Sequence, residues 1–376
     1  MPRTILIRGV NWLGDAVMAT PALQRLREAH PEAKLTLLTH EKLADLWHNH
    51  PALDEVVTFG ARESVFQLGR RLRAEKFQTA LILPNSPRSA LETFLARIPE
   101  RIGYRKSWRN WFLTRAIPLR PELVTMRKRS AREIERLINS PPKSEAIPAQ
   151  SHHLYHYLHL AAALGAKPDP LPPHIAVATS EVAAIQDRFS FPRNASERPL
   201  LFGLNAGAEY GPAKRWPRDR FIAAAIALQR QTRCHWWIFG SQADRPLASG
   251  IASEIQSGAA SASGKVQSLA GQTSLRELCA GLKACDLVLT NDTGPMHLAA
   301  AVGTPVIALF GSTSPELTAP GLPGDTKHVL LKSDVACAPC FLRTCPIDFR
   351  CMNNLTVDQV VAAVMNTVRK NTLRSL

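Results

Sequence analysis

Residues 5–39, ILIRGVNWLGDAVMATPALQRLREAHPEAKLTLLT, decide the fold class. The apolar run from Ile5 to Val10 has the length of a buried strand, and Leu35 to Thr39 is a second such run. Between them, Asp15 to Ala29 has the length and apolar spacing of an amphipathic helix. This order predicts a βαβ unit, which belongs to a parallel sheet covered by helices.

The same alternation continues along the chain and begins again in its second half. Further apolar runs of strand length occupy residues 80–83, 200–205, 236–239, 287–291 and 306–310. The segment 167–173, KPDPLPP, separates the two series, because proline ends helices and stiffens a linker. A chain of 376 residues is also too long for one ordinary core. We therefore expect an α/β protein with two Rossmann-like βαβ domains.

Changes in the periodicity give the expected domain boundaries. The predicted N-terminal domain covers residues 1–175 and carries an insertion at about 99–150, where Arg, Lys, Trp and Pro accumulate. Residues 176–198 are predicted to be a linker and residues 199–355 the C-terminal domain. Residues 356–376 have the spacing of a helix, which could pack against either domain.

The composition limits the classes of partner. A net charge of +15 favours a phosphorylated substrate, an anionic lipid or a nucleic acid. The densest basic run, Arg127 to Arg129, has no aromatic residues nearby, which argues against nucleic acid. No apolar run is long enough to cross a bilayer, and the N-terminus lacks the features of a signal peptide. We expect a cytoplasmic protein with no transmembrane segment and no nucleic-acid partner.

The segment 287–301, LVLTNDTGPMHLAAA, joins a predicted buried strand directly to a helix of small residues. Open parallel sheets bind ligands at the carboxyl ends of their strands, where this turn lies. Thr293 and Gly294 would leave backbone amides free at the helix N-terminus, where Pro295 suits the first helical position. His297 in the first turn can face the same ligand. The turn predicts an anion site; an ordinary helix cap is the alternative.

A second turn of this kind, residues 10–18 with sequence VNWLGDAVM, follows the first strand. Gly14 permits close approach of the backbone to a ligand. Asp15 has two interpretations that the sequence leaves open. It caps the helix, or it is a general base at the carboxyl end of a strand.

The loop NAGAEYGPAKRWP, residues 205–217, stands between the first strand and the first helix of the second half. It is rich in glycine, and Lys214 and Arg215 lie at its end. A lysine is a compact cation suited to phosphate, whereas the dipole of the following helix disfavours a merely solvated cation at its start. The loop therefore favours a phosphate-binding function.

Four cysteines, Cys337, Cys340, Cys345 and Cys351, crowd into a short segment. Disulfides are not expected in a cytoplasmic protein, so the alternatives are a structural zinc site with four thiolate ligands or reduced cysteines without a metal. The first pair has the CxxC spacing of zinc sites, but the second pair does not.

Taken in order, these motifs resemble those of the ADP-heptose:lipopolysaccharide heptosyltransferases, glycosyltransferase family 9, and among them the type II enzymes. The resemblance covers nearly the whole chain. It rests on Gly14-Asp15, on the segment 214–217 (KRWP), on the segment 291–297 (NDTGPMH) and on the segment 305–315 (PVIALFGSTSP).

The resemblance implies the GT-B architecture, in which two Rossmann-like domains face each other across a cleft. The acceptor would bind mainly to the N-terminal domain and the nucleotide sugar mainly to the C-terminal domain. The implied reaction is an inverting transfer of L-glycero-D-manno-heptose from ADP-heptose to the first heptose of the lipopolysaccharide inner core, heptosyl-Kdo2-lipid A. The alternatives are a type I or type III heptosyltransferase with another core acceptor and a noncatalytic nucleotide-binding module.

The resemblance also implies roles for individual residues. Asp15 would be the catalytic base, and Lys214 would stabilise the departing ADP. The donor-binding residues would be Asn205, Gly207, Asp292, Thr293, Gly294 and His297, and the acceptor-binding residues Asn11, Trp12, Arg101 and Arg105. No cofactor would be required for catalysis.

The implied acceptor is a lipopolysaccharide core at the inner leaflet of the cytoplasmic membrane. The protein would then be peripheral on the inner face of that membrane, with Trp108 and Trp111 at the lipid interface. The run Arg127 to Arg129 is expected on the acceptor side, together with Arg105 and Arg109.

Overall fold

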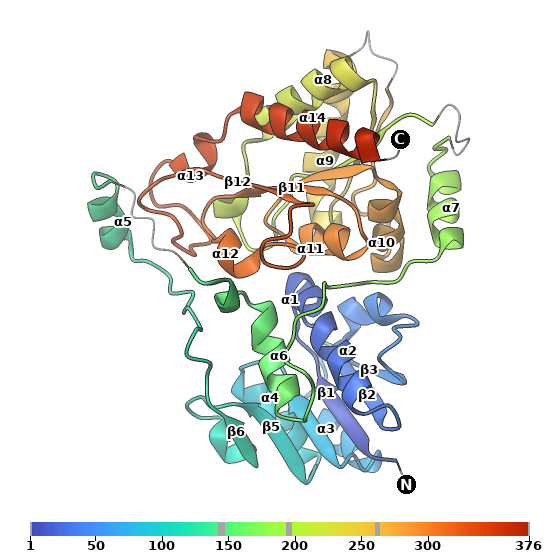
Figure 1. The fold of residues 1–376 in the computed structure, drawn as a ribbon, viewed down its shortest axis with the longest axis vertical. Coiled ribbons are helices and arrows are strands. Elements are labelled where there is room, and N and C mark those ends of the chain that lie inside the picture. Colours follow the sequence, from blue (N-terminus) through green and yellow to red (C-terminus); the bar gives the residue numbers. More distant parts are fainter. Residues whose placement is uncertain (1, 142–146, 193–197, 260–263, 375–376) are drawn as a thin grey trace. The chain divides into compact units, whose positions relative to one another are not determined.

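The computed structural model describes residues 2–141, 147–192, 198–259 and 264–374, with side chains up to residue 371. The chain forms two compact units. The first consists of Met1–Leu123 and Gln150–Ile175, and the second of Val124–Ala149 and Ala176–Leu376. Each unit contains a six-stranded sheet in which every strand pairing is parallel (Figure 1). The predicted α/β class with two Rossmann-like domains is confirmed.

The sheet of the first unit has the order β3-β2-β1-β4-β5-β6. Its helices α2 and α6 pack against each other, as do α3 and α4. The strands are β1 (Thr4–Arg8), β2 (Lys34–His40), β3 (Glu55–Phe59), β4 (Thr79–Ile82), β5 (Glu100–Tyr104) and β6 (Arg115–Ile117). The helices are α1 (Leu13–Met18), α2 (Thr20–Ala29), α3 (Val65–Ala74), α4 (Pro87–Leu95) and α6 (Leu154–Ala162), with 3-10 turns η1 (Glu41–Trp47) and η2 (Asn110–Phe112).

The second sheet has the order β12-β11-β10-β7-β8-β9. Helices α8, α9 and α14 lie on one side of it and α10, α11 and α12 on the other (Figure 1). The strands are β7 (Leu201–Asn205), β8 (His235–Ile238), β9 (Val266–Ser268), β10 (Leu287–Asn291), β11 (Val306–Phe310) and β12 (Val329–Lys332). The helices are α5 (Ala131–Leu137), α7 (Thr179–Arg188), α8 (Arg218–Thr232), α9 (Arg245–Gly258), α10 (Leu275–Ala284), α11 (Gly294–Ala301), α12 (Pro315–Thr318), α13 (Arg350–Asn353) and α14 (Val357–Arg374), with 3-10 turns η4 (Pro212–Lys214) and η5 (Gln242–Asp244).

Both sheets reverse the direction of strand addition at one point. In the first unit the chain adds strands on one side of β1 and then continues from β4 on the other side, and β7 and β10 have the same relation in the second unit. Open parallel sheets bind ligands at the carboxyl ends of the strands where this reversal occurs. The topology therefore predicts ligand binding at the loops after β1 and β4 in the first unit and at the loops after β7 and β10 in the second.

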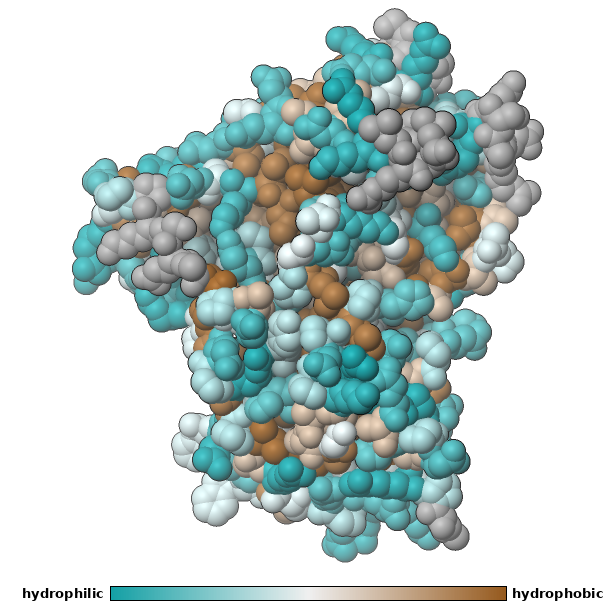
Figure 2. Space-filling model, viewed as in Figure 1, coloured by the Kyte–Doolittle hydropathy of each residue, from teal (hydrophilic) through white to brown (hydrophobic). Residues whose placement is uncertain are grey.

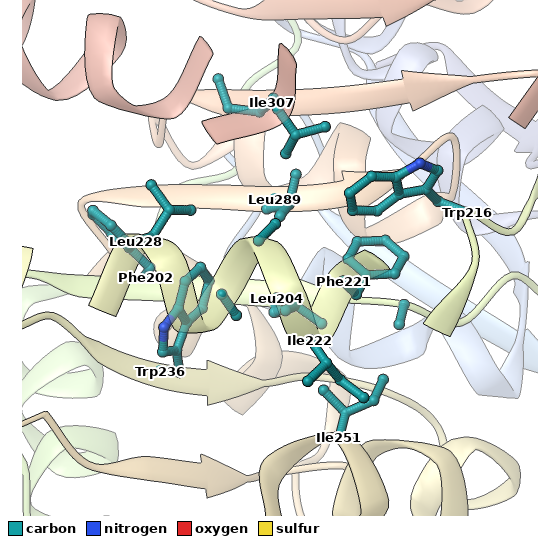
Figure 3. Close-up of a cluster of buried hydrophobic side chains, with 14 of the residues drawn as sticks. Phe202, Leu204, Trp216, Phe221, Ile222, Leu228, Trp236, Ile251, Leu289 and Ile307 are labelled. Atoms are coloured by element: carbon teal, nitrogen blue, oxygen red, sulfur yellow. The ribbon is translucent and has the colours of Figure 1, made fainter. Parts of the chain in front are cut away.

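A hydrophobic cluster fixes β7 and β10 side by side in the second unit. Phe202 and Leu289 lie on these strands and are fully buried, and they pack with Phe221 of α8, Trp236 of β8 and Ile307 of β11 (Figure 3). Large aromatic rings dominate such a core because each removes a large apolar area from water. The positions of the loops that follow these strands are thereby determined by the core beneath them.

Part of the predicted N-terminal insertion belongs to the second unit. Residues 124–149 cluster there, where Ile134 of α5 packs against Cys337 and Cys340. The backbone amide of Arg129 donates to the carbonyl of Cys340 at 3.0 Å. An apolar contact distant in sequence therefore holds this segment to the second unit rather than to the predicted N-terminal domain, and the place of Arg127 to Arg129 on the acceptor side stays a prediction.

The predicted linker at 176–198 contains the helix α7, which packs against α10 of the second unit. The C-terminal helix predicted for 356–376 is α14, and it packs against α8. Residues 142–146 of the insertion, 193–197 of the linker and 375–376 of the terminal helix lie outside the described residues.

Hydrophilic residues cover most of the visible face of each unit, and hydrophobic residues form separate patches among them (Figure 2). Within the described parts of the chain, we find no helix that has both the length and the apolar character needed to cross a membrane.

Candidate functional site

The clearest constellation of polar groups joins three loops at the carboxyl edge of the second sheet. Asp292 directly follows β10 and is almost fully buried. Its Oδ2 accepts a hydrogen bond of 2.6 Å from Nζ of Lys214, in the loop after β7, and another of 2.6 Å from Oγ1 of Thr313, after β11. The predicted residues Lys214 and Asp292 therefore lie together, but as an ion pair.

This pairing clarifies what each residue can do. A buried carboxylate repels phosphate, whereas an ammonium group and a hydroxyl attract it. The side chain of Lys214 keeps 15% of its surface exposed, whereas that of Asp292 keeps only 3%. Asp292 is thus placed to orient Lys214 and Thr313, and these two residues are placed to meet an anion.

Asn205 and Asn291, the last residues of β7 and β10, organise the turn between them. Asn205 Nδ2 donates to Oγ1 of Thr293 at 3.0 Å. Asn291 accepts from the backbone amide of Trp216 at 2.9 Å and donates to the carbonyl of Ala206 at 2.9 Å. Because buried polar groups are costly when unpaired, this network fixes the loops in one arrangement.

Thr293 is the N-cap residue of α11 and makes no capping hydrogen bond with its side chain. The side chain of Thr293 therefore does not cap the first backbone amides of the helix, which begin at Gly294. An anion site requires such uncapped amides. His297 lies in the first turn and is buried. The predicted anion-binding turn therefore has a suitable local geometry.

Gly207 is required by a close approach within the protein. A Cβ atom on Gly207 would lie 2.7 Å from Oδ1 of Asp244, at the end of η5. The carboxylate of Asp244 caps its own turn by accepting from the amide of Ser241 at 3.0 Å. This geometry explains the glycine without a ligand, so its donor-binding role stays a prediction.

In the first unit, Asp15 lies in α1, directly beyond the carboxyl end of β1. Its Oδ1 accepts a hydrogen bond of 3.1 Å from the hydroxyl of Tyr157, and Nδ1 of His153 lies 3.5 Å away. Burial and the neighbouring carboxylate raise the pKa of Tyr157 well above its ordinary value, so Tyr157 remains a neutral donor. A quarter of the Asp15 side chain is exposed, which leaves it accessible to a substrate.

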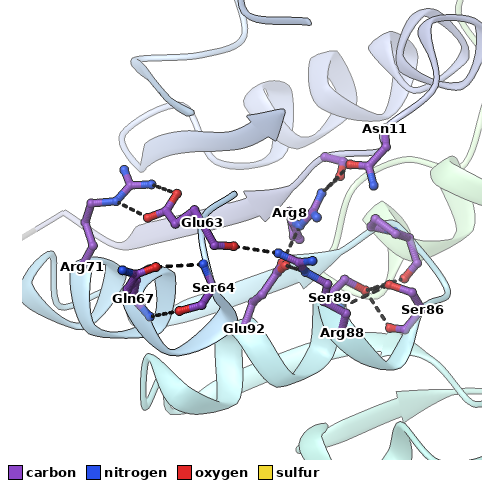
Figure 4. A network of polar contacts seen from close by, with 12 residues as sticks. Arg8, Asn11, Glu63, Ser64, Gln67, Arg71, Ser86, Arg88, Ser89 and Glu92 are labelled. Carbon is purple, nitrogen blue, oxygen red and sulfur yellow. Dashed lines mark hydrogen bonds and ion pairs between the residues drawn. The ribbon is translucent and has the colours of Figure 1, made fainter. Parts of the chain in front are cut away.

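A buried ion pair anchors the loop before Asp15. Arg8, the last residue of β1, donates from Nε to Glu92 of α4 at 2.8 Å, and both side chains are almost fully buried. Arg8 also donates to the side chain of Asn11 at 3.1 Å (Figure 4). The predicted acceptor residue Asn11 is thus held by the framework of the unit. Its neighbour Trp12 is 44% exposed.

The remaining basic residues of the predicted acceptor side differ in accessibility. Arg101 donates to the carbonyl of Phe112 at 2.7 Å and stabilises the segment that follows β5, whereas Arg105 is exposed. Arg109 is fully buried and donates to Asn85 at 3.1 Å, and burial lowers its pKa to about 10. Arg105 thus presents an open cationic side chain, whereas acceptor binding by the partly buried Arg101 stays a prediction.

The zinc alternative for the cysteine segment finds no support in the geometry of the described residues. Among the described residues, which include all four cysteines, no three Cys, His, Asp or Glu side chains are grouped so that they could hold a metal ion. Cys337 and Cys340 pack against Ile134, and Cys351 joins the main core. Burial raises the pKa of Cys351 to about 12, so this cysteine is a thiol when no metal is bound.

Three residues that complete these sites have no predicted role, although Thr313 lies within the segment 305–315. Tyr157 and Thr313 contact Asp15 and Asp292 from other loops and helices, and Glu92 pairs with Arg8. Each contact joins residues at least 21 positions apart. In the sequence, a functional role for these three residues is indicated only by their positions, next to the end of a strand or in an amphipathic helix.

Comparison with known proteins gives consistent results. The sequence model of glycosyltransferase family 9 (heptosyltransferase) matches residues 120–349. Lipooligosaccharide heptosyltransferase 2 of Haemophilus ducreyi and lipopolysaccharide heptosyltransferase 2 of Escherichia coli are each 30% identical to the chain, over 84% of its length and 85% of theirs. The solved structure of E. coli ADP-heptose lps heptosyltransferase II superposes with a TM-score of 0.76 at 26% identity, covering 98% of this chain and 99% of that one.

The buried pair of Arg8 and Glu92 yields a test of the framework. Replacing Glu92 by alanine leaves the guanidinium of Arg8 buried without its carboxylate, so we expect the free energy of unfolding to fall by about 3–5 kcal/mol in urea denaturation. The control is Glu63→Ala, which removes the more exposed pair with Arg71 and should cost less than about 1 kcal/mol. Equal costs for the two variants would contradict the importance of the buried pair.

Proposed function

Since the chain belongs to glycosyltransferase family 9, the heptosyltransferases, and transfers heptose in lipopolysaccharide core biosynthesis, we propose its specific reaction. The donor is ADP-heptose carrying L-glycero-D-manno-heptose, and the acceptor is the first heptose of the inner core, heptosyl-Kdo2-lipid A. The transfer inverts the anomeric configuration. The main support is similarity over most of the chain to relatives named heptosyltransferase 2.

The donor diphosphate is assigned to the second unit. Lys214 and Thr313 present an ammonium group and a hydroxyl at one oxygen of Asp292, and α11 begins beside them. A helix N-terminus and a fixed cation stabilise the negative charge that grows on the diphosphate as the sugar departs. This arrangement supports Lys214 as a catalytic residue and the turn at Thr293 and Gly294 as part of the donor site. The expectation that catalysis requires no cofactor stays a prediction.

The catalytic base is assigned to Asp15 of the first unit. An acceptor hydroxyl gives its proton to Asp15 while its oxygen forms a bond to the anomeric carbon of the donor. The bond from that carbon to the β-phosphate oxygen breaks, and its electron pair leaves with ADP. The hydrogen bond from Tyr157 holds Asp15 in one orientation, which supports the role of a base over that of a helix cap.

We also propose that the protein is peripheral on the inner face of the cytoplasmic membrane. Trp108 and Trp111 are 82% and 84% exposed, and Arg105 and Lys106 precede them in sequence. Trp108 has a φ of 64°, which is unfavourable for a bulky residue and suggests a function for the conformation. Indole rings next to cations suit the headgroup region of an anionic bilayer.

A panel of acceptors tests the reaction. With ADP-heptose as donor, we expect mass spectrometry to detect a second heptose on a core that already carries one, and no product on a core without heptose. Transfer to the heptose-free core would instead identify a type I enzyme. Binding of ADP without transfer to any core, including longer ones, would indicate a noncatalytic nucleotide-binding module.

The variant Asp15→Asn tests the assigned base. The amide keeps the size of the side chain but cannot take the proton, so kcat should fall on the order of 10²- to 10⁴-fold. ADP affinity, measured by calorimetry, should be unchanged because the proposed donor groups belong to the second unit. Asp45→Asn, an exposed change in η1, is the control and should keep full activity. A normal kcat for Asp15→Asn would contradict the role of Asp15 as a base and would leave the helix cap as its role.

The double variant Trp108→Ser and Trp111→Ser tests the membrane proposal. Loss of two exposed indoles should weaken binding to phosphatidylglycerol vesicles at least on the order of tenfold, as measured by sedimentation. Transfer to a delipidated one-heptose core should be unchanged. Phe66→Ser, which removes another exposed aromatic ring, should bind vesicles normally. Equal binding by the double variant and the wild type would contradict this surface assignment.

A further inference from the structure

The cysteine segment contacts the loop that carries Thr313. We call residues 336–343 the clamp loop. The backbone amides of Cys340 and Phe341 both donate to the carbonyl of Ser312, at 3.1 and 2.8 Å. Ser312 directly precedes Thr313, whose hydroxyl binds Asp292. The clamp loop therefore fixes the backbone on one side of the proposed diphosphate site.

The clamp loop also holds the loop that carries Lys214. The amide of Ala213 donates to the carbonyl of Arg343 at 3.0 Å, and the hydroxyl of Tyr210 donates to the carbonyl of Phe341 at 2.7 Å. Gly211 has a φ of 150°, and a Cβ atom there would lie 2.5 Å from the Arg343 carbonyl oxygen. Glycine is thus required for this contact. One short segment connects the two loops that present Lys214 and Thr313.

The outer side of the clamp loop is held by the segment that precedes and includes α5. Arg129 contributes its backbone amide to Cys340 at 3.0 Å and a guanidinium nitrogen to the carbonyl of Ala336 at 2.9 Å. Ile134 packs against Cys337 and Cys340. These contacts give the cysteines a packing role and keep the clamp loop against the site.

The clamp loop places a second cation, Arg343, against the same aromatic ring that Lys214 faces. Nζ of Lys214 lies 5.1 Å from the ring centroid of Tyr210, and the guanidinium carbon of Arg343 lies 5.3 Å from the same centroid. Lys214 is paired with Asp292, whereas the structure records no ion pair for Arg343 within the described residues. Arg343 is exposed, so its guanidinium is accessible to a ligand.

The ion pair between Lys214 and Asp292 affects the net positive charge that a ligand meets at this site. The carboxylate of Asp292 offsets the charge of Lys214, so the pair by itself supplies little net positive charge. A nucleoside diphosphate sugar is an anion, and its diphosphate gains one further negative charge when the bond to the sugar breaks. A planar guanidinium binds two phosphate oxygens at once and keeps its charge at every relevant pH.

We propose that Arg343 is a further donor-binding and catalytic residue, which contacts the diphosphate beside Lys214 and stabilises the departing nucleoside diphosphate. This inference rests on the proposed function. The acceptor oxygen bonds to the anomeric carbon, the electron pair of the broken bond moves to the β-phosphate oxygen, and the guanidinium of Arg343 donates hydrogen bonds to the diphosphate.

Kinetics and ADP binding of Arg343→Ala test the assignment. We expect kcat to fall on the order of tenfold to a hundredfold and ADP to bind about tenfold more weakly. The dependence of ADP affinity on salt concentration should become shallower, because one fixed cation is lost. Arg343→Lys should recover part of the ADP affinity, since it restores the charge without the planar fork. A defect in packing alone would not produce this salt dependence or this rescue.

The matched control is Arg132→Ala, which removes an exposed arginine from α5 and changes the net charge equally. It should retain wild-type kcat, ADP affinity and salt dependence. If Arg343→Ala also behaves like the wild type, the assignment of Arg343 is wrong while the proposed function stands. If the wild type itself transfers no heptose to any acceptor, the proposed function fails first, and ADP binding still decides whether Arg343 belongs to a nucleotide site.

Discussion

The carboxylate of Asp292 is the constraint on which the second unit's site depends. It is almost fully removed from water, and a buried charge is tolerated only when it is paired and hydrogen-bonded. Lys214 and Thr313 satisfy it from the loops after β7 and β11, while Asp292 itself follows β10. The buried carboxylate of Asp292 thus connects the loops that follow three strands, β7, β10 and β11. The cation and the hydroxyl are held in place before any ligand arrives.

Much of this fold could be predicted from the sequence, and the reason is physical. Central strands of a parallel sheet are covered on both faces, so β1, β10 and β11 are continuous apolar runs that a sequence reveals. The sequence did not reveal the strands at the sheet edges. These strands are β3, β6, β9 and β12; they are only partly buried, and β6, β9 and β12 are also short, so they lack a clear apolar run.

Residues of the candidate site could be predicted where their neighbours in the sequence form a recognisable motif. Asp15, Lys214 and Asp292 stand where the chain passes from a strand to a helix, and such transitions show their glycines and polar residues in sequence. The cysteine spacing left a zinc site and reduced thiols as alternatives, because spacing measures distance along the chain, whereas a metal site needs sulfur atoms that converge. Contacts such as that of Ile134 with Cys337 join distant segments, so the sequence alone could not assign the insertion to the correct unit.

The two points of strand reversal carry ion pairs of different kinds, and the difference explains a division of roles. Arg8 and Glu92 are both almost fully buried, so that pair supports the framework, while Asp15 of the following helix keeps a quarter of its side chain exposed. In the second unit the carboxylate is buried, but Lys214 remains partly exposed. An accessible carboxylate suits proton removal, and accessible cations suit a diphosphate. One sheet topology thereby supplies an accessible carboxylate, the proposed base, in the first unit and an accessible cation, part of the proposed anion site, in the second.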